Sequence, residues 1–143
     1  MNDDSPERLH GDVVVTGQSR RIRSVRIVYA WLAAIYCLCV IVQVFLAGMG
    51  LFVSSNSWQW HRTFANSFEL VSVVMFALSF AGRIRGVLRW FPLGLFALTV
   101  LQHMTLQLFS GVLPALHTVN ALLLFWMSLV LMKNTLKWTV NSK

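Results

Sequence analysis

Residues 113–131 read LPALHTVNALLLFWMSLVL, an almost unbroken apolar run with one histidine near its start. About 20 apolar residues are enough for an α-helix to cross the hydrocarbon core of a bilayer. Pro114 suits the first turn of a helix, where its missing N–H removes no intrahelical hydrogen bond. The run therefore predicts a membrane-spanning helix over 114–132. His117, in its first turn, is an ionisable side chain that needs a partner.

Three further apolar runs precede this one, over 27–52, 60–81 and 90–109. The chain of 143 residues is 57% hydrophobic and only 12% charged, far below the charged share of a soluble domain. We therefore predict an all-α fold, an integral membrane four-helix up-down bundle over 27–132. The polar segment 1–26 shows no sustained helical period and is expected to be a disordered basic tail, with a second tail over 133–143.

The net charge of +7 would suggest a nucleic-acid partner for a soluble protein, but here the positions of the basic residues indicate membrane topology. Eleven of the twelve Lys and Arg residues precede the first run, lie between the second and third, or follow the fourth, and only Arg62, at the start of the second run, lies at the other side. The positive-inside rule then predicts that both termini are cytoplasmic and that loops 54–59 and 110–113 face outward. We expect a multi-pass protein of the cell membrane, such as a bacterial plasma membrane, with the lipid bilayer as partner and no nucleic acid.

A second histidine, His61, lies at the start of the second run, as His117 does at the start of the fourth. In an up-down bundle with short loops, the second and fourth helices stand diagonally and begin at the same surface. The diagonal is about 11–14 Å, which two imidazoles can span with a metalloporphyrin between them. One turn further in, Ala65 and Ala121 would let a flat macrocycle approach the backbone. The alternative for either histidine is a solvated residue at the membrane interface.

Three further polar residues, Gln43, Glu69 and His103, are expected at comparable depths in the first, second and third helices. Glu69 is the only acidic residue in the four runs. We expect these side chains to form one intramembrane polar layer. The layer would act either as a hydrogen-bonded packing element or as a proton relay, and both interpretations remain open.

Three segments carry a family resemblance, VQVFLAGMGLF (42–52), WHRTFANSFELV (60–71) and LQHMTLQLFSGVLPALHTVNALLLF (101–125). They resemble the four-helix half of haem A synthase, and also small bacterial four-helix membrane proteins of similar pattern. In haem A synthases, each half binds a haem through one histidine at the outer end of its second helix and one at the outer end of its fourth. The resemblance implies that His61 and His117 bind haem b here.

The chain also departs from that family. The synthases have two such halves, and their active half uses a carboxylate and often a cysteine pair in the first outer loop. Here that loop has neither, and Cys37 and Cys39 lie inside the first run. The resemblance therefore implies a single haem-binding bundle rather than a complete synthase.

Two functional hypotheses follow from the sequence. In the first, the protein binds one haem b for electron transfer or haem handling, because bis-histidine iron has no vacant position for oxygen chemistry. In the second, it is a haem-free structural or partner-binding subunit, whose small Gly, Ala and Ser faces meet another membrane protein or a second copy. No P-loop, nucleophile triad or thiolate metal motif is present, so we do not expect a stand-alone enzyme.

Overall fold

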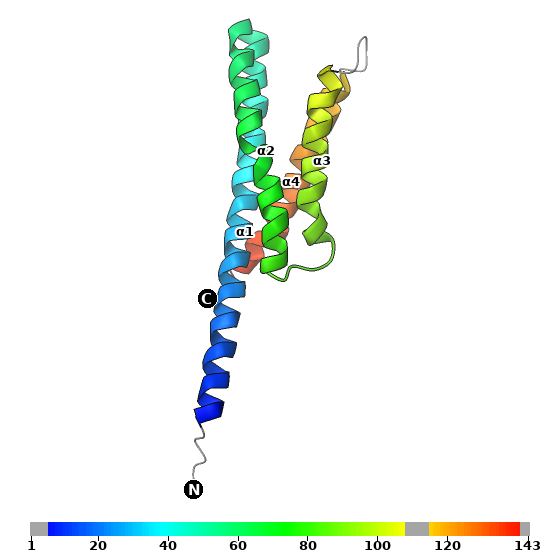
Figure 1. Ribbon diagram of the computed structural model, residues 1–143. Coiled ribbons are helices and arrows are strands. Elements are labelled where there is room, and N and C mark those ends of the chain that lie inside the picture. Colours follow the sequence, from blue (N-terminus) through cyan, green and yellow to red (C-terminus); the bar gives the residue numbers. More distant parts are fainter. Residues whose placement is uncertain (1–5, 108–114, 141–143) are drawn as a thin grey trace.

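The computed structural model describes residues 6–107 and 115–140, with side chains at 17, 19–105 and 115–139. Its elements are four long helices and one short 3-10 turn: α1 (Pro6–Phe52), η1 (Ser55–Ser57), α2 (Trp58–Ala81), α3 (Val87–Gln107) and α4 (Leu116–Val140). Each of the four helices is long and apolar enough to cross a membrane, and the described residues include no strand. The prediction of an all-α membrane bundle is confirmed (Figure 1).

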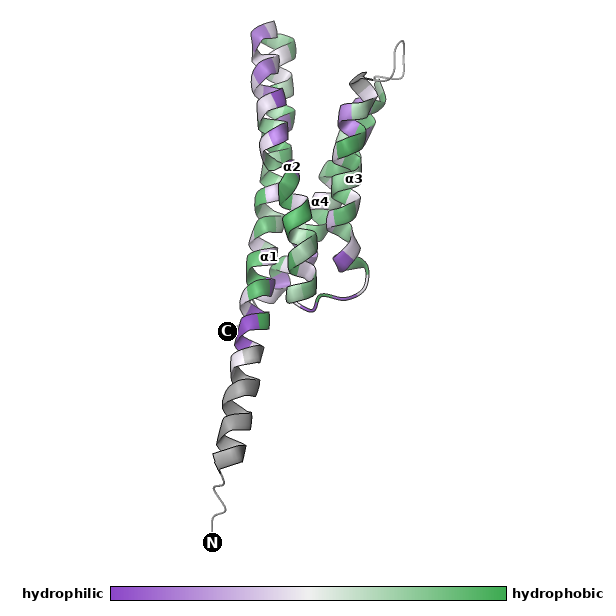
Figure 2. Cartoon of the chain, viewed as in Figure 1, coloured by the Kyte–Doolittle hydropathy of each residue, from purple (hydrophilic) through white to green (hydrophobic). Residues whose placement is uncertain are grey.

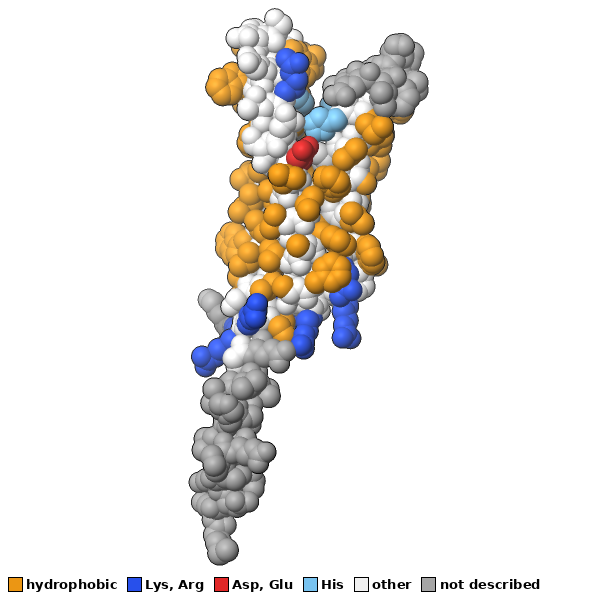
Figure 3. Space-filling model, in the orientation of Figure 1, with side chains coloured by type: hydrophobic (Ala, Val, Ile, Leu, Met, Phe, Trp, Pro, Cys, Tyr) orange, Lys and Arg blue, Asp and Glu red, His pale blue; other side chains and the backbone are white. Residues whose placement is uncertain are grey.

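The four helices pack as a square, in which α1 and α3 each contact both α2 and α4. α2 and α4 therefore lie on a diagonal, and both begin at the same end of the bundle (Figure 1). We call this the histidine end. At the opposite, basic end, Lys and Arg side chains gather below the apolar part of the surface (Figure 3). The hairpin of α1 and α2 and the hairpin of α3 and α4 separate toward the histidine end (Figure 1).

The first helix begins at Pro6, so the prediction of a disordered tail over 1–26 is wrong for 6–26. The polar segment continues directly from a membrane helix, and its turns extend that helix without the cost of nucleating a new one. The 47 residues of α1 span about 70 Å, against about 30 Å for the hydrocarbon core of a bilayer. α1 accordingly projects beyond the bundle at the basic end (Figure 1). α4 likewise continues to Val140, past its predicted end at residue 132.

The apolar core fills the basic half and the middle of the bundle, where the helices are also most uniformly apolar (Figure 2). It reaches Val40 on α1, Phe68 on α2 and Leu124 on α4. Closer to the histidine end, the buried residues that the structure describes are small or polar: Gly50, Ser57, Thr105 and Asn120. The hairpins therefore meet without large apolar side chains at the end that carries the histidines.

A hydrogen bond across the bundle compensates for Pro92, which is buried inside α3. Proline has no N–H, so Pro92 leaves the carbonyl of Leu88, four residues earlier, without its helical donor. The hydroxyl of Tyr29 on α1 donates to this carbonyl at 2.7 Å. α1 thus completes the hydrogen bonding of α3, the helix diagonally opposite.

The turn between α2 and α3 is also held by α1. Nε of Arg26 donates to the carbonyl of Gly82 at 2.9 Å. The chain then reverses through two residues in the left-handed region, Arg83 at φ 49° and Gly86 at φ 68°. Gly86 adopts this conformation without the steric cost that other residues meet there. Both hairpins are therefore joined firmly at the basic end.

Candidate functional site

His61 and His117 meet across the diagonal of the bundle. Their ring centroids are 6.4 Å apart, and the ring planes are inclined by 53°. Both side chains are half-buried, and each lies in the first turn of its helix, His61 on α2 and His117 on α4. Histidine side chains are visible where the two hairpins separate (Figure 3). The structure thus brings together the two histidines that the sequence placed at one level.

Each of these histidines has one ring nitrogen held by a backbone carbonyl of the preceding helix. Nδ1 of His61 lies 3.1 Å from the carbonyl oxygen of Gln43, and Nδ1 of His117 lies 3.2 Å from that of Gln102. A carbonyl oxygen only accepts, so Nδ1 carries the proton in both rings. In the neutral ring, Nε2 then presents a lone pair, and neither Nε2 has a hydrogen-bond partner among residues 19–105 and 115–139.

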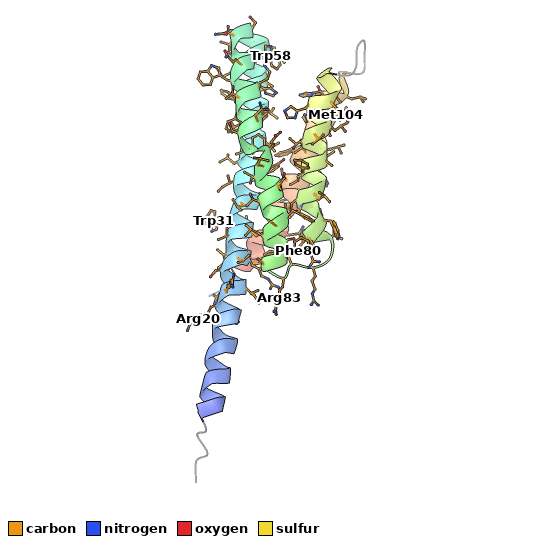
Figure 4. The ribbon with its side chains drawn as sticks, viewed as in Figure 1. Arg20, Trp31, Trp58, Phe80, Arg83 and Met104 are labelled. Carbon is orange, nitrogen blue, oxygen red and sulfur yellow. The ribbon has the colours of Figure 1, made fainter. Side chains whose placement is uncertain are left out.

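The backbone of His61 is fixed as firmly as its ring. The amide Nε2 of Gln43 donates to the carbonyl of His61 at 2.9 Å, so the two residues join α1 and α2 by reciprocal hydrogen bonds. The Trp58 indole meets the His61 ring edge to face, with centroids 5.6 Å apart. Trp58 itself rests on Gly50, where an added Cβ would lie 2.7 Å from the indole. This glycine therefore permits the aromatic contact that orients His61 (Trp58, Figure 4).

A second polar network fixes His117 against α3. The Thr105 hydroxyl donates to the carbonyl of Gln102 at 2.9 Å and lies 3.4 Å from Nδ1 of His117. Asn120 is buried, and its amide nitrogen donates to the carbonyl of Leu98 and to Oε1 of Gln102, both at 2.8 Å. Gln102 therefore accepts hydrogen bonds through its backbone from His117 and through its side chain from Asn120.

Two buried amide oxygens beside this site lack partners among the described residues, Oε1 of Gln43 and Oδ1 of Asn120. A buried acceptor without a hydrogen bond has a substantial desolvation cost. Ala65 and Ala121 are half-buried, one turn further in than His61 and His117 respectively. Among the residues that the structure describes, the site thus combines two imidazole nitrogens and two amide oxygens without partners, together with two small residues.

His103 differs from the other two histidines because acceptors face both of its ring nitrogens. Nδ1 lies 3.0 Å from the carbonyl of Thr99, and Nε2 lies 3.2 Å from Oδ1 of Asn66 on α2. It therefore presents no free nitrogen to a ligand. Gln43, Glu69 and His103 are not joined in one hydrogen-bonded layer, since Gln43 pairs with His61 and His103 with Asn66.

The residues that hold the imidazoles of His61 and His117 in place were not predicted from the sequence. Asn120 carried a usable signal, since it is an amide within an apolar run and lies three residues after His117. No such signal marks Asn66, Trp58 and Thr105, because their partners lie on other helices or depend on side-chain orientation. No group of three or more His, Cys, Asp and Glu side chains that could hold a metal ion occurs in the part of the chain that the structure describes.

Comparison with known proteins gives one match. Residues 43–107 match the model of a family of unknown function, DUF6220, a segment that begins at Gln43 in α1, contains all of α2 and ends with α3. The match includes His61 and Glu69 but not His117. No curated protein and no solved structure matches the chain. None of these comparisons links it to haem A synthase.

Proposed function

We propose that this multi-pass membrane protein binds one haem b through His61 and His117, for electron transfer or haem handling. The observation that carries the proposal is the pairing of two imidazoles, each with Nδ1–H on a carbonyl and Nε2 free, at a centroid separation of 6.4 Å. Metal-ligating histidines generally donate their second ring N–H to such an oxygen, which fixes the tautomer and the ring orientation.

At this separation, His61 and His117 would hold the haem iron through their Nε2 nitrogens. Two histidines are enough for haem, whereas an isolated metal ion needs more protein ligands. When bound, haem would supply one-electron exchange.

The surroundings favour a large apolar ligand. The apolar core ends at Val40, Phe68 and Leu124, which lie further into the bundle than the two histidines. The hairpins separate beyond them (Figure 1). His61 and His117 would bind the ligand, and the apolar side chains of Val40, Phe68 and Leu124 would exclude water from it. The backbone carbonyls that accept from Nδ1 would keep these protons in place.

We further propose that the histidine end faces outward from the cell membrane and that both termini are cytoplasmic. The basic residues support this orientation, because they gather at the other end of the bundle, where Arg26 and Arg89 lie beside the α2–α3 turn. Arg62, at the histidine end, is the exception. Partners beyond the bilayer would be an electron donor and acceptor.

The test is the visible spectrum of protein purified in detergent from cells supplied with a haem precursor. The wild type should show the sharp bands of a low-spin, six-coordinate haem b. His61→Ala and His117→Ala should each abolish this spectrum or convert it to a five-coordinate form, whereas His103→Ala should preserve it because both nitrogens of His103 are already engaged. A colourless wild-type protein, or ligand variants with the wild-type spectrum, would leave the haem-free subunit as the better hypothesis.

A further inference from the structure

Aromatic and basic side chains lie together where α2 ends and α3 begins, at the basic end. The Phe76 ring contacts Phe80 and, across to α3, Trp90, with centroids 5.2 and 5.8 Å apart. The guanidinium of Arg89 lies over the Phe80 ring, 4.8 Å from its centroid (Phe80, Figure 4). Phe80 and Trp90 remain 52% and 57% exposed. Together with two exposed arginines of the adjoining turn, these residues form what we call the α2–α3 patch: Phe76, Phe80, Arg83, Arg85, Arg89 and Trp90.

Arg89 is held at the border of the hydrocarbon. Its Nε donates to the carbonyl of Ile84 at 2.9 Å, and the side chain is half-buried. The ring beneath it, Phe80, belongs to the second candidate span, which ends at Ala81, and Arg89 itself belongs to the third, which begins at Val87. A carbonyl is neutral, so this contact fixes the guanidinium without balancing its charge. An anion at the membrane surface would provide that balance.

No carboxylate side chain is placed beside the patch in the part of the chain that the structure describes. Of the five acidic residues, only Glu69 has a described side chain, and it lies eleven residues before Phe80, about 16 Å along α2. Asp12 lies fourteen residues before Arg26, which contacts the α2–α3 turn, and so about 21 Å away along α1. The other three acidic residues precede Asp12 in the chain. The patch therefore carries a concentrated positive charge.

We propose that the α2–α3 patch binds an anionic phospholipid of the leaflet at the basic end. The guanidiniums of Arg83, Arg85 and Arg89 donate to the phosphate of the lipid, since basic side chains next to membrane helices attract anionic headgroups. An acyl chain packs on the exposed rings of Phe80 and Trp90, because aromatic rings of this kind sit at the headgroup level with their apolar body toward the hydrocarbon. This site is independent of haem and of the side of the membrane that the basic end faces.

Other anions fit the patch less well. Free phosphate can accept from the arginines but makes no use of the aromatic rings. An acidic soluble protein would not reach Phe80 and Trp90, because both belong to segments that the hydrocarbon surrounds. A zwitterionic phospholipid carries a cation beside its phosphate, which opposes the attraction to the arginines. An anionic phospholipid matches both the charge and the apolar surface.

The experiment is native mass spectrometry of the full chain in detergent, titrated with palmitoyl-oleoyl phosphatidylglycerol or with the phosphatidylcholine that has the same acyl chains. The wild type should bind the first phosphatidylglycerol at least about tenfold more tightly than phosphatidylcholine, since three arginines face its phosphate. Equal affinity for the two lipids would overturn the proposal, because the patch would then distinguish no headgroup charge.

Variants of the patch assign the preference to its residues. Arg89→Gln should weaken phosphatidylglycerol binding about fivefold, the loss expected for one basic residue near an anionic headgroup, and leave phosphatidylcholine binding unchanged. Arg89→Lys keeps the charge and should lose less. The triple variant Arg83→Gln, Arg85→Gln, Arg89→Gln should bind both lipids alike. The matched control is Arg20→Gln, which removes an exposed arginine of α1 outside the patch (Arg20 and Arg83, Figure 4).

Two further results separate this site from other sources of binding. Equal losses in Arg20→Gln and Arg89→Gln would overturn the site, because general surface charge would then account for the preference. Displacement of the lipid by an equal concentration of glycerol 3-phosphate would assign the arginines to a free phosphate instead. The haem-ligand double variant, His61→Ala with His117→Ala, should keep the preference for phosphatidylglycerol whatever its visible spectrum, since the patch lies at the other end of the bundle. Circular dichroism of each variant confirms that its helices remain folded.

Discussion

The Tyr29 hydroxyl donates a 2.7 Å hydrogen bond to the carbonyl of Leu88 on the diagonally opposite helix. That carbonyl lacks its helical donor because Pro92 lies four residues later. The bond therefore links Tyr29 on α1 to the backbone of α3 at the point where Pro92 interrupts the helical hydrogen bonds.

Tyr29→Phe should lower the free energy of unfolding by about 1–2 kcal/mol, because it leaves a buried carbonyl without a donor. In the background of Pro92→Ala the same change should cost less than about 0.5 kcal/mol, since the new N–H of residue 92 takes over the carbonyl of Leu88. A double-mutant cycle by denaturant unfolding in detergent measures the difference. An equal cost of Tyr29→Phe in both backgrounds would show that the hydroxyl acts in some other way.

Gly50→Ala should disturb the histidine pair, while Gly48→Ala should not. A Cβ at Gly50 would lie 2.7 Å from the Trp58 indole, whereas a Cβ at Gly48 meets nothing within 4 Å. Displacement of the indole would release its contact with His61. We expect changed tryptophan fluorescence and, in haem-loaded protein, a weakened six-coordinate spectrum for Gly50→Ala only. Gly48→Ala should gain up to about 1 kcal/mol in stability from helix propensity. Similar spectra for the two variants would contradict the proposed role of Trp58.

Asn120→Asp should be far more damaging than Asn134→Asp. The Asn120 amide nitrogen faces two acceptors, the carbonyl of Leu98 and Oε1 of Gln102, so a carboxylate there would place acceptor against acceptor in a buried site. Asn134 makes only an exposed hydrogen bond to the carbonyl of Val130. We expect a loss of about 3 kcal/mol or more for Asn120→Asp, as for other uncompensated buried charges, and less than about 1 kcal/mol for the control. Comparable unfolding midpoints for the two variants would be the contrary result.

Single cysteines placed at the two ends of the bundle test the proposed orientation. In a background with Cys37→Ala and Cys39→Ala, Ser55→Cys should react with a membrane-impermeant maleimide added to intact cells. Arg85→Cys should react only after the membrane is opened, because the basic end is expected on the cytoplasmic side. Both positions are exposed, so lack of reaction reports location rather than burial. The reverse labelling pattern would invert the proposed topology.

Apolar run length was enough to predict the four helices, because a bilayer leaves few alternatives to a helix over each run. It could not predict the helical polar segment before the first span, since 6–26 has no apolar period and depends on the helix that follows it. The histidine pair could be placed from helix direction and starting point alone. Their carbonyl partners could not, because the pairing of Nδ1 of His117 with Gln102 depends on the relative rotation of two helices. The contact of His103 with Asn66 could not be predicted for the same reason.

The position of the core has a mechanical consequence for the histidine pair. Residues such as Tyr29, Met75 and Leu131 pack the hairpins together near the basic end, while no large apolar side chain among those described joins them beside His61 and His117. The packed core therefore holds the hairpins together, and the part of each hairpin beyond it can tilt about the end of the core. From Phe68, where the core ends on α2, to His61 the unpacked part of the helix is about 10 Å long, so a tilt of about 6° there moves the histidine by about 1 Å. Substitutions in the core at Phe68 or Leu124 would therefore tune the spacing of the two imidazoles.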